Sequence, residues 1–370
     1  SSAASDVYKR QGKLETLRHA LGPRAVSLPE VVADSFDEEK LAAMAEKTRV
    51  VISTVGPYAK YGSKLVEACV AHGTHYCDLA GEAQWIRQMV DQHHEAAVVR
   101  SARIVHCCGF DSVPMDIGVW FLQQEAMRRH GSYCPSVAML VKATRGGPSG
   151  GTMASVLNVI REARADRDVA KVLGDPYALN PPGERSGPDR PDQRTVRFDE
   201  VAETWTAPFV MAGINTKIVR RSHALLNYPY GRHFRYREAV MMGEGASAWL
   251  KGAAMTAGLG GFVLASSFGV TRRLLERYVL PAPGEGPSRE QRESGFFDLR
   301  QFGVLPDGAV IKSRITCDRD PGYGSTSKML AESGVCLAID NLDSGGGVLT
   351  PASAMGEALL TRLQENAGLS

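Results

Sequence analysis

Hydrophobic residues in the first third of the chain alternate between continuous runs and runs with helical spacing. Continuous apolar runs of strand length lie at 49–55 (RVVISTV), 75–79 and 103–108, and a shorter run at 31–34 ends in an acid. Between these runs, apolar positions recur every three or four residues, which predicts helices at 13–21, 37–46, 62–72, 82–100 and 114–130. Strands alternating with helices at this spacing predict βαβ units and a parallel sheet.

The second half of the chain has a different pattern. It predicts strands at 136–142 and 235–241, a helix at 150–165, a hairpin of 296–304 with 310–317, a helix at 321–339 and a last helix opened by Thr350 and Pro351. Residues 175–194 are rich in Pro, Gly and Arg, which predicts an exposed loop.

These patterns together predict an α/β fold with two domains. A Rossmann-like, doubly wound parallel sheet, N-terminally truncated, is expected over 12–132, and a second α+β domain for substrate binding or dimerisation over 133–345. The second domain carries a hydrophobic insertion at 246–280. The C-terminal helix within 346–370 is expected to pack back on the Rossmann domain.

The first eleven residues do not resemble a natural N-terminus. The chain lacks an initiating Met, and residues 5–11 (SDVYKRQ) match the in-frame translation of a transposon end used to prepare sequencing libraries. We therefore expect residues 1–11 to be adaptor-derived or disordered and the natural protein to begin upstream. No G-x-G-x-x-G occurs in the first 60 residues, and we expect the first βα turn to belong to that upstream segment.

Composition excludes several classes of protein. The chain has 43 Lys and Arg against 41 Asp and Glu, so its formal net charge of +2 provides no bulk positive field for nucleic acid. Seven cysteines without a C-x2-C pair argue against a disulfide framework or a structural zinc, and the nine histidines show no metal-ligand spacing. We expect no metal site, and a cytoplasmic protein.

Three stretches at the predicted strand ends resemble a known family. Residues 51–61 (VISTVGPYAKY), 75–82 (HYCDLAGE) and 104–118 (IVHCCGFDSVPMDIG) are similar to the saccharopine-dehydrogenase-like oxidoreductases. Motifs at 150–152, 215–224, 230–236 and 347–360 resemble the mycobacterial branch of trans-acting enoyl reductases, so the resemblance runs from about residue 13 to the C-terminus.

The resemblance implies an oxidoreductase that uses NADP(H), with NAD(H) as an alternative. It implies reduction of a carbon–carbon double bond on a polyketide or lipid intermediate, free or bound to a carrier protein, in glycolipid biosynthesis at the plasma membrane. A homodimer is a further expectation. The rival interpretations are a saccharopine-type amino-acid dehydrogenase and a membrane-associated scaffold without catalysis. Because the pyrophosphate of the cofactor normally rests on the first βα turn, we expect this chain to bind NADPH weakly.

Ligands of parallel α/β sheets bind at the carboxyl ends of the strands. The turn after the central strand is the first candidate for cofactor binding and consists of Thr54, Val55, Gly56, Pro57 and Tyr58. Gly56 would let the backbone approach a ligand closely. The alternative is a plain strand-to-helix turn. Asp34 either bounds the adenine pocket or caps the next helix.

A second candidate turn for cofactor binding consists of Gly109, Phe110, Asp111 and Ser112. It would form a wall between nicotinamide and substrate, and the alternative is a turn in which Asp111 and Ser112 cap the following helix. For catalysis, Asp78 and Glu82 could take part in proton transfer and Tyr76 could donate a proton; the alternative for each acid is a salt bridge or a cap.

Two further segments have alternative interpretations. The basic cluster of Lys217, Arg220, Arg221, Arg232, Arg235 and Arg237 either binds a phosphopantetheine or lipid headgroup or forms a solvated face. Residues 252–271 carry no charge and are followed by Arg272 and Arg273, which predicts a membrane span, an interfacial anchor, or a buried helix or subunit contact. We expect 246–277 to attach to an anionic membrane surface.

Overall fold

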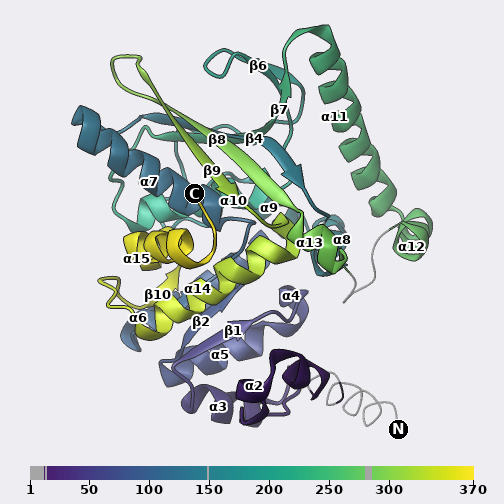
Figure 1. Ribbon diagram of the computed structural model, residues 1–370, viewed down its shortest axis with the longest axis vertical. Helices are drawn as coiled ribbons and strands as arrows, with labels where there is room; N and C mark the ends of the chain where they lie inside the picture. The colour runs from purple at the N-terminus through teal and green to yellow at the C-terminus, as the bar shows by residue number, and fades with distance from the viewer. Residues whose placement is uncertain (1–11, 13–14, 148–149, 280–285) are drawn as a thin grey trace.

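The computed structural model describes residues 12, 15–147, 150–279 and 286–370 (Figure 1). The prediction for residues 1–11 lies outside these ranges, as do residues 13–14 of the first predicted helix and residue 280 of the predicted insertion.

Four strands form a parallel sheet, in the order β1 (Val50–Ser53), β2 (His75–Asp78), β3 (Arg103–Val105) and β10 (Gly347–Leu349). All three pairings are parallel. The parallel α/β sheet predicted from the first third of the chain is thus confirmed, and a segment near the C-terminus supplies its fourth strand. Because the strands are parallel, their carboxyl ends meet at one edge of the sheet.

Helices cover both faces of this sheet (Figure 1). One side carries α5 (Ser63–His72) and α6 (Ala83–Val99), with α3 (Glu38–Glu46) packed outside α5. The other side carries α14 (Thr326–Ile339) and α15 (Pro351–Asn366). Helix α5 ends at Gly73, whose φ of 71° lies in the left-handed region that favours glycine. Two short helices, α2 (Pro23–Val26) and α4 (Tyr58–Tyr61), precede α3 and α5.

A second, mixed sheet holds six strands in the order β5-β6-β7-β4-β8-β9. Their bounds are β4 (Ser136–Arg145), β5 (Arg197–Asp199), β6 (Thr204–Ala207), β7 (Arg235–Gly243), β8 (Phe296–Val304) and β9 (Val310–Cys317). The predicted hairpin is the antiparallel pair β8–β9, and β4 pairs with β7 in parallel. The remaining helices of this half are α8 (Gly150–Ala165), α9 (Arg167–Gly174), α10 (Ala212–Leu225), α13 (Arg289–Glu293) and the π-helical turn η1 (Pro321–Ser325).

One hydrophobic core joins the two sheets. Helix α7 (Val113–His130) contributes Met115 and Leu122 to a buried cluster that also contains Val105 of β3 and Met139 of β4. Helix α15 packs against α7 and α14. It begins at Thr350, whose side chain accepts a hydrogen bond from the backbone N–H of Ser353 in a capping box, which is the predicted N-terminus.

The uncharged stretch at 252–271 is divided between two helices that project from the second sheet (Figure 1). They are α11 (Gly245–Ser267) and α12 (Gly269–Tyr278), separated by Phe268 in an extended conformation. Within the described ranges, α11 is the one helix long and apolar enough to cross a membrane, and 11% of its most apolar window is buried. Because α11 is mostly exposed, a buried core helix is excluded as its interpretation in this chain.

Three predictions of local structure are wrong. Residues 31–34 form no strand: Val31 and Val32 are exposed, and no described strand lies beside them to complete a ladder. The strand at 103–108 stops at Val105, because Cys107 adopts a φ of 63° that turns the chain.

The loop predicted at 175–194 is the third case and is wrong only in part: it forms no helix or strand and is mostly exposed or half-buried, but residues 177–180 are buried. Three buried arginines hold its carbonyl groups. Arg87 donates to the carbonyls of Ala178 and Asn180 at 3.1 Å each, and Arg220 donates to the Pro176 carbonyl at 3.1 Å. Arg221 donates to the Leu179 carbonyl and to the Val348 carbonyl of β10.

Candidate functional site

Glu82 holds the turn at the carboxyl end of β1. Its carboxylate accepts hydrogen bonds from the backbone N–H groups of Tyr58 at 2.7 Å and Ala59 at 3.1 Å, which open α4, and from the Ser155 hydroxyl of α8 at 3.0 Å. Burial raises the pKa of the Glu82 carboxyl, and these three donors oppose that effect. Glu82 is fully buried. It therefore caps a helix, as one of the two alternatives expected, and its predicted role in proton transfer stays a prediction.

The side chain of Tyr58 turns into the protein beneath this turn. Its hydroxyl donates to the Ser53 carbonyl at 3.1 Å and accepts from the Leu79 N–H at 3.2 Å. Its ring stacks on Trp85, with the centroids 5.6 Å apart. Thr54, Val55 and Gly56 remain exposed. Any ligand at this turn would therefore meet backbone and the exposed residues, with the Tyr58 ring as support from below.

Asp78 connects the turns that follow β2 and β3. Its carboxylate accepts from the Ala80 N–H at 2.9 Å and the Cys107 N–H at 3.2 Å, and lies 2.7 Å from Nδ1 of His106. Its backbone carbonyl also accepts from the Cys108 N–H at 2.7 Å. Asp78 is completely buried, so it positions both turns, and its predicted role in proton transfer stays a prediction.

Tyr76 lies deeper in the protein than a surface proton donor would. It is completely buried in the hydrophobic cluster around α5 and α6, with its ring edge-on to His106 at 5.9 Å. Burial raises the pKa of its phenol well above the ordinary value. Its proposed role as a proton donor also stays a prediction.

The turn after β3 is closely packed at its first half. A Cβ on Gly109 would lie 2.6 Å from Cδ2 of Leu79, so any larger residue there has to displace the Leu79 side chain. The Phe110 N–H donates to the Thr326 hydroxyl of α14 at 3.0 Å, and the Phe110 ring contacts Phe297 at 4.9 Å. These contacts fix the turn against both the second sheet and α14.

Ser112 does not cap α7 with its side chain, so the capping alternative is wrong for this residue. Its hydroxyl lies 3.1 Å from Oδ1 of Asn215 in α10, and the Asn215 amide donates to Glu238 of β7 at 3.0 Å. The Tyr236 hydroxyl donates to the other Glu238 oxygen at 2.9 Å. This buried network ties the turn after β3 to the second sheet.

Asp111 differs from its neighbours because it is only partly buried. Its carboxylate has no hydrogen-bond or ion-pair partner among the residues that the structure describes. Desolvation raises its pKa to about 6. Asp111 is thus a partly exposed ionisable group at this edge of the sheet.

Asp34 is exposed and caps no helix. Its carboxylate accepts from the Phe36 N–H at 3.0 Å in a local turn, whereas Asp37 caps α3 through the Lys40 N–H. The capping alternative for Asp34 is therefore wrong, because the N-cap residue of α3 is Asp37, three residues later. Its adenine-side role stays a prediction.

Several residues of this site were not found from the sequence: Trp85, His106, Ser155, Thr326, Asn215 and Glu238. They come from six different elements or turns, and each reaches the strand ends through tertiary packing. His106 alone carried a local signal, since it precedes the turn after β3 by three residues.

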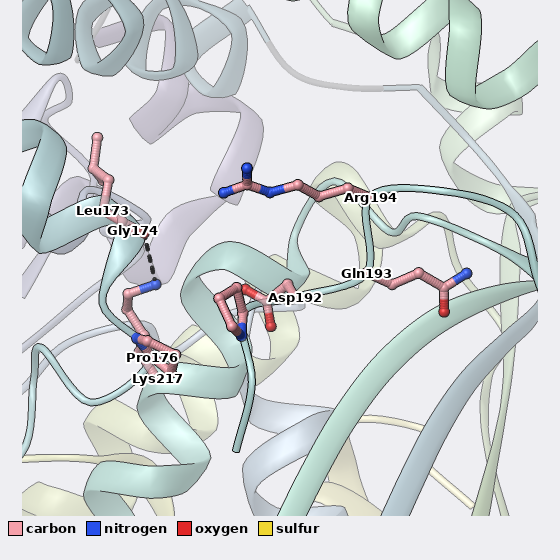
Figure 2. Close-up of a pocket in the computed structure, with 8 residues that line it drawn as sticks. Leu173, Gly174, Pro176, Asp192, Gln193, Arg194 and Lys217 are labelled. Atoms are coloured by element: carbon pink, nitrogen blue, oxygen red, sulfur yellow. Dashed lines mark hydrogen bonds between the residues drawn. The ribbon is translucent and has the colours of Figure 1, made fainter. Parts of the chain in front are cut away.

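The predicted basic cluster does not form one surface. Lys217, Arg220 and Arg221 are buried on the inner face of α10, so the solvated face is wrong for these three residues, and headgroup binding stays a prediction. Arg220 pairs with Asp189 at 2.6 Å, and Lys217 donates to the carbonyls of Leu173 at 3.1 Å and Gly213 at 2.9 Å (Figure 2). Arg232 and Arg237 form ion pairs with Glu184 and Asp199 at the surface.

The carboxyl edge of the first sheet leaves backbone open at two glycines. A Cβ on Gly56 would meet only ordinary contacts, the nearest at 3.5 Å, and a Cβ on Gly81 would meet nothing within 4 Å. Backbone is therefore open to a ligand after both β1 and β2. The polar backbone and the adjacent Asp111 carboxyl provide hydrogen-bonding groups beside this opening.

Comparison with known proteins agrees with this geometry. Residues 9–105 match the family model of the saccharopine dehydrogenase NADP-binding domain. A Mycobacterium tuberculosis relative for which trans-acting enoyl reductase activity is proposed is 42% identical over 362 residues, covering 94% of this chain and 85% of that protein. The trans-acting enoyl reductase of Mycobacterium leprae is 40% identical over 363 residues, covering 95% and 86%.

A solved structure of saccharopine dehydrogenase (L-Glu forming) from Saccharomyces cerevisiae is similar at 12% identity and a TM-score of 0.48, covering 91% of this chain and 87% of that one. The family match over residues 9–105 gives the chain an NADP-binding domain of the saccharopine dehydrogenase type, which is the domain of an oxidoreductase. Within that class, the chain belongs to the family of the trans-acting enoyl reductases.

We expect Gly56→Val to weaken cofactor binding without unfolding the protein. The added side chain projects into ordinary van der Waals space, where it would obstruct a ligand that approaches the backbone. The measurement is NADPH fluorescence titration together with a thermal melt. Gly109→Ala is the contrasting variant, because its Cβ points into the protein at the Leu79 and Thr326 side chains, so its effect should appear in the melting temperature. Unchanged NADPH affinity in Gly56→Val would refute the assignment.

Proposed function

We propose that this enzyme uses NADPH to reduce the carbon–carbon double bond of an enoyl group on a polyketide-derived lipid intermediate, free or attached to a carrier protein. The observation that supports this is about 40% identity to trans-acting enoyl reductases over nearly the whole chain. NADP(H) is favoured over NAD(H) by the family of the nucleotide-binding domain. We place the product in glycolipid biosynthesis.

Reduction of an enoyl group needs a proton for the α-carbon as well as a hydride for the β-carbon. Bound NADPH supplies the hydride. The chain must supply the proton, and Asp78 and Glu82 are both buried and engaged by backbone donors. Asp111 is partly exposed, and its pKa of about 6 is close to neutral pH, as suits a general acid. We therefore favour Asp111 as the proton donor.

The experiment is an isotope assay with an α,β-unsaturated acyl thioester and NADPH carrying deuterium at the transferred position. The product should carry deuterium at the β-carbon. Asp111→Asn should lower kcat by about 10²–10⁴, the usual contribution of a general acid. Asp168→Asn, an exposed acid on α9, is the control. Absence of deuterium in the product would contradict the function, whereas an unchanged kcat in Asp111→Asn would contradict only the donor.

Helices α11 and α12 support attachment to an anionic membrane. Trp249, Leu250, Leu264, Phe268 and Leu274 are large apolar side chains exposed along them. Arg272 and Arg273 lie at the start of α12, as basic residues do at membrane interfaces. A lipid substrate is easier to reach from a membrane surface, so we place the enzyme in the cytoplasm, peripheral to the plasma membrane. A homodimer is a second way in which the apolar surface could be covered.

We expect the protein to float with anionic liposomes at low salt and to be released at high salt. The attraction between the basic side chains and the anionic lipids is screened over about 8 Å at physiological ionic strength, so added salt should weaken it. The double variant Arg272→Glu/Arg273→Glu should remain at the bottom of the gradient at both salt concentrations. If the wild-type protein does not float with anionic liposomes at low salt, the proposed membrane attachment is wrong.

A further inference from the structure

Beside α10 lies a small pocket of about 120 Å³, away from the strand ends described above (Figure 2). It is enclosed by the last turn of α9, the segment at 191–194 and α10. Its lining residues are Leu173, Gly174, Pro176, Pro191, Asp192, Gln193, Arg194 and Lys217.

The ammonium group of Lys217 is the unusual component of this pocket. The Lys217 side chain is 2% exposed, and in the part of the chain that the structure describes no carboxylate lies within ion-pair distance of it. The carbonyls of Leu173 and Gly213 accept two of its three N–H bonds. The third N–H belongs to a group that lines the pocket, and a buried charge left without a counter-ion is costly.

A second cation reaches the same pocket. The guanidinium of Arg194 extends towards Leu173 and Gly174 (Figure 2), and it forms no ion pair with any residue in the described ranges. The only acidic lining residue is Asp192, and one of its oxygens already accepts from the Thr216 hydroxyl at 3.0 Å. The lining side chains therefore carry two positive charges and one negative charge.

The carboxyl end of α9 would by itself repel an anion, because its terminal carbonyls carry partial negative charge. The Leu173 carbonyl is, however, already bound by Lys217, which removes the nearest part of that repulsion. The amide N–H groups of Gln193 already donate to the carbonyls of Thr195 and Thr206, so they are not counted among the donors available to a ligand in the pocket. The lining side chains thus offer two cationic donors beside the Asp192 carboxylate, while the Asp175 carboxylate next to the lining also stabilises the charge of Lys217. The volume of the pocket is too small for a nucleotide.

The geometry points to a binding site for a small oxyanion, of the size and charge of a phosphate group, held between Lys217 Nζ and the guanidinium of Arg194. The inference goes beyond the reductase activity, since neither residue touches the strand ends where the cofactor is placed. A phosphate ester at the end of a larger ligand and free inorganic phosphate share this chemistry.

The test is isothermal titration of the protein with inorganic phosphate, with acetate at equal ionic strength as a second arm. We expect saturable phosphate binding at one site and at least a tenfold loss of affinity in Arg194→Gln. Arg190→Gln, which removes the same charge outside the pocket, should bind as the wild type does. Because Arg194 is exposed, its substitution should not affect folding; Lys217→Met, checked by a thermal melt, should abolish binding if it folds.

Equal loss in Arg190→Gln and Arg194→Gln would mean non-specific attraction and would overturn the site, as would the absence of phosphate binding by the wild type. Equally strong binding of acetate would overturn the phosphate assignment. The isotope assay measures the reductase activity, whereas the titration measures phosphate binding beside α10. A negative result in one experiment can therefore be told apart from a negative result in the other.

Discussion

Replacement of Glu82 by alanine should be among the most damaging single changes in this protein. The variant leaves the N–H groups of Tyr58 and Ala59 without their acceptor inside the protein. Each buried donor without a partner costs about 1–3 kcal/mol, so we expect the free energy of unfolding to fall by about 2–5 kcal/mol. Urea denaturation measures this loss, and NADPH affinity should fall with it, because the turn at 54–57 loses its support.

Two further variants give this prediction its controls. Glu82→Gln keeps the shape but directs an amide N–H towards one of the two backbone donors, so it should lose part of the stability. Glu67→Ala removes an exposed carboxylate whose partner Lys64 also pairs with Glu38, and it should change stability by less than about 1 kcal/mol. A Glu82→Ala protein as stable as Glu67→Ala would show that the backbone donors find other partners.

Glu238 should make the stability of the wild-type protein decrease as the pH rises from about 4.5 to 8. Burial raises the pKa of this carboxyl to about 8 in the folded protein, above its ordinary value of 4.5. Between these two pH values the folded chain therefore binds a proton that the unfolded chain has released, and folding becomes less favourable with each step in pH. Each pH unit corresponds to at most about 1.4 kcal/mol, so the full interval amounts to several kcal/mol.

The matched variant is Glu238→Gln, which keeps the neutral shape and has no proton to lose. The unfolding free energy of both proteins is measured at several pH values. The value for Glu238→Gln minus the value for the wild type should increase as the pH rises. Asp111 and Asp116 also have raised pKa values, of about 6 and 7, but they are present in both proteins and cancel in the difference. Parallel pH curves for the two proteins would contradict the prediction.

The sequence predicted those strands that are marked by continuous runs of β-branched residues. RVVISTV gave β1 within a few residues, because such a run is too short and too apolar for an exposed helix. The run at 31–34 has a similar composition but no strand beside it, and a strand is stable only with a neighbour to complete its hydrogen bonds. Pairing partners are not visible in local composition.

The candidate site could be located from the sequence, but the roles of its residues could not. The ends of β1, β2 and β3 are local features of the sequence, and they predicted Asp78, Glu82 and Asp111 as candidate site residues. Whether each acid is engaged or free depends on groups far along the chain, such as Ser155 for Glu82. The burial of Arg220 and Arg221 in α10 could not be predicted for the same reason. Their carbonyl partners lie in a loop whose composition is typical of exposed chain.

The buried arginines that hold the loop at 175–194 also restrict how the enzyme can move. Two-lobed enzymes commonly close over their substrates by rotating one lobe about a hinge. Here Arg221 of α10 binds Leu179 of the loop and Val348 of β10 at once, and Arg87 of α6 binds the loop on either side of Leu179. A rotation of the second sheet away from the first would break these bonds together. Any opening for a bulky lipid therefore has to come from segments outside this tie, such as the projecting pair α11 and α12, of which α11 is mostly exposed.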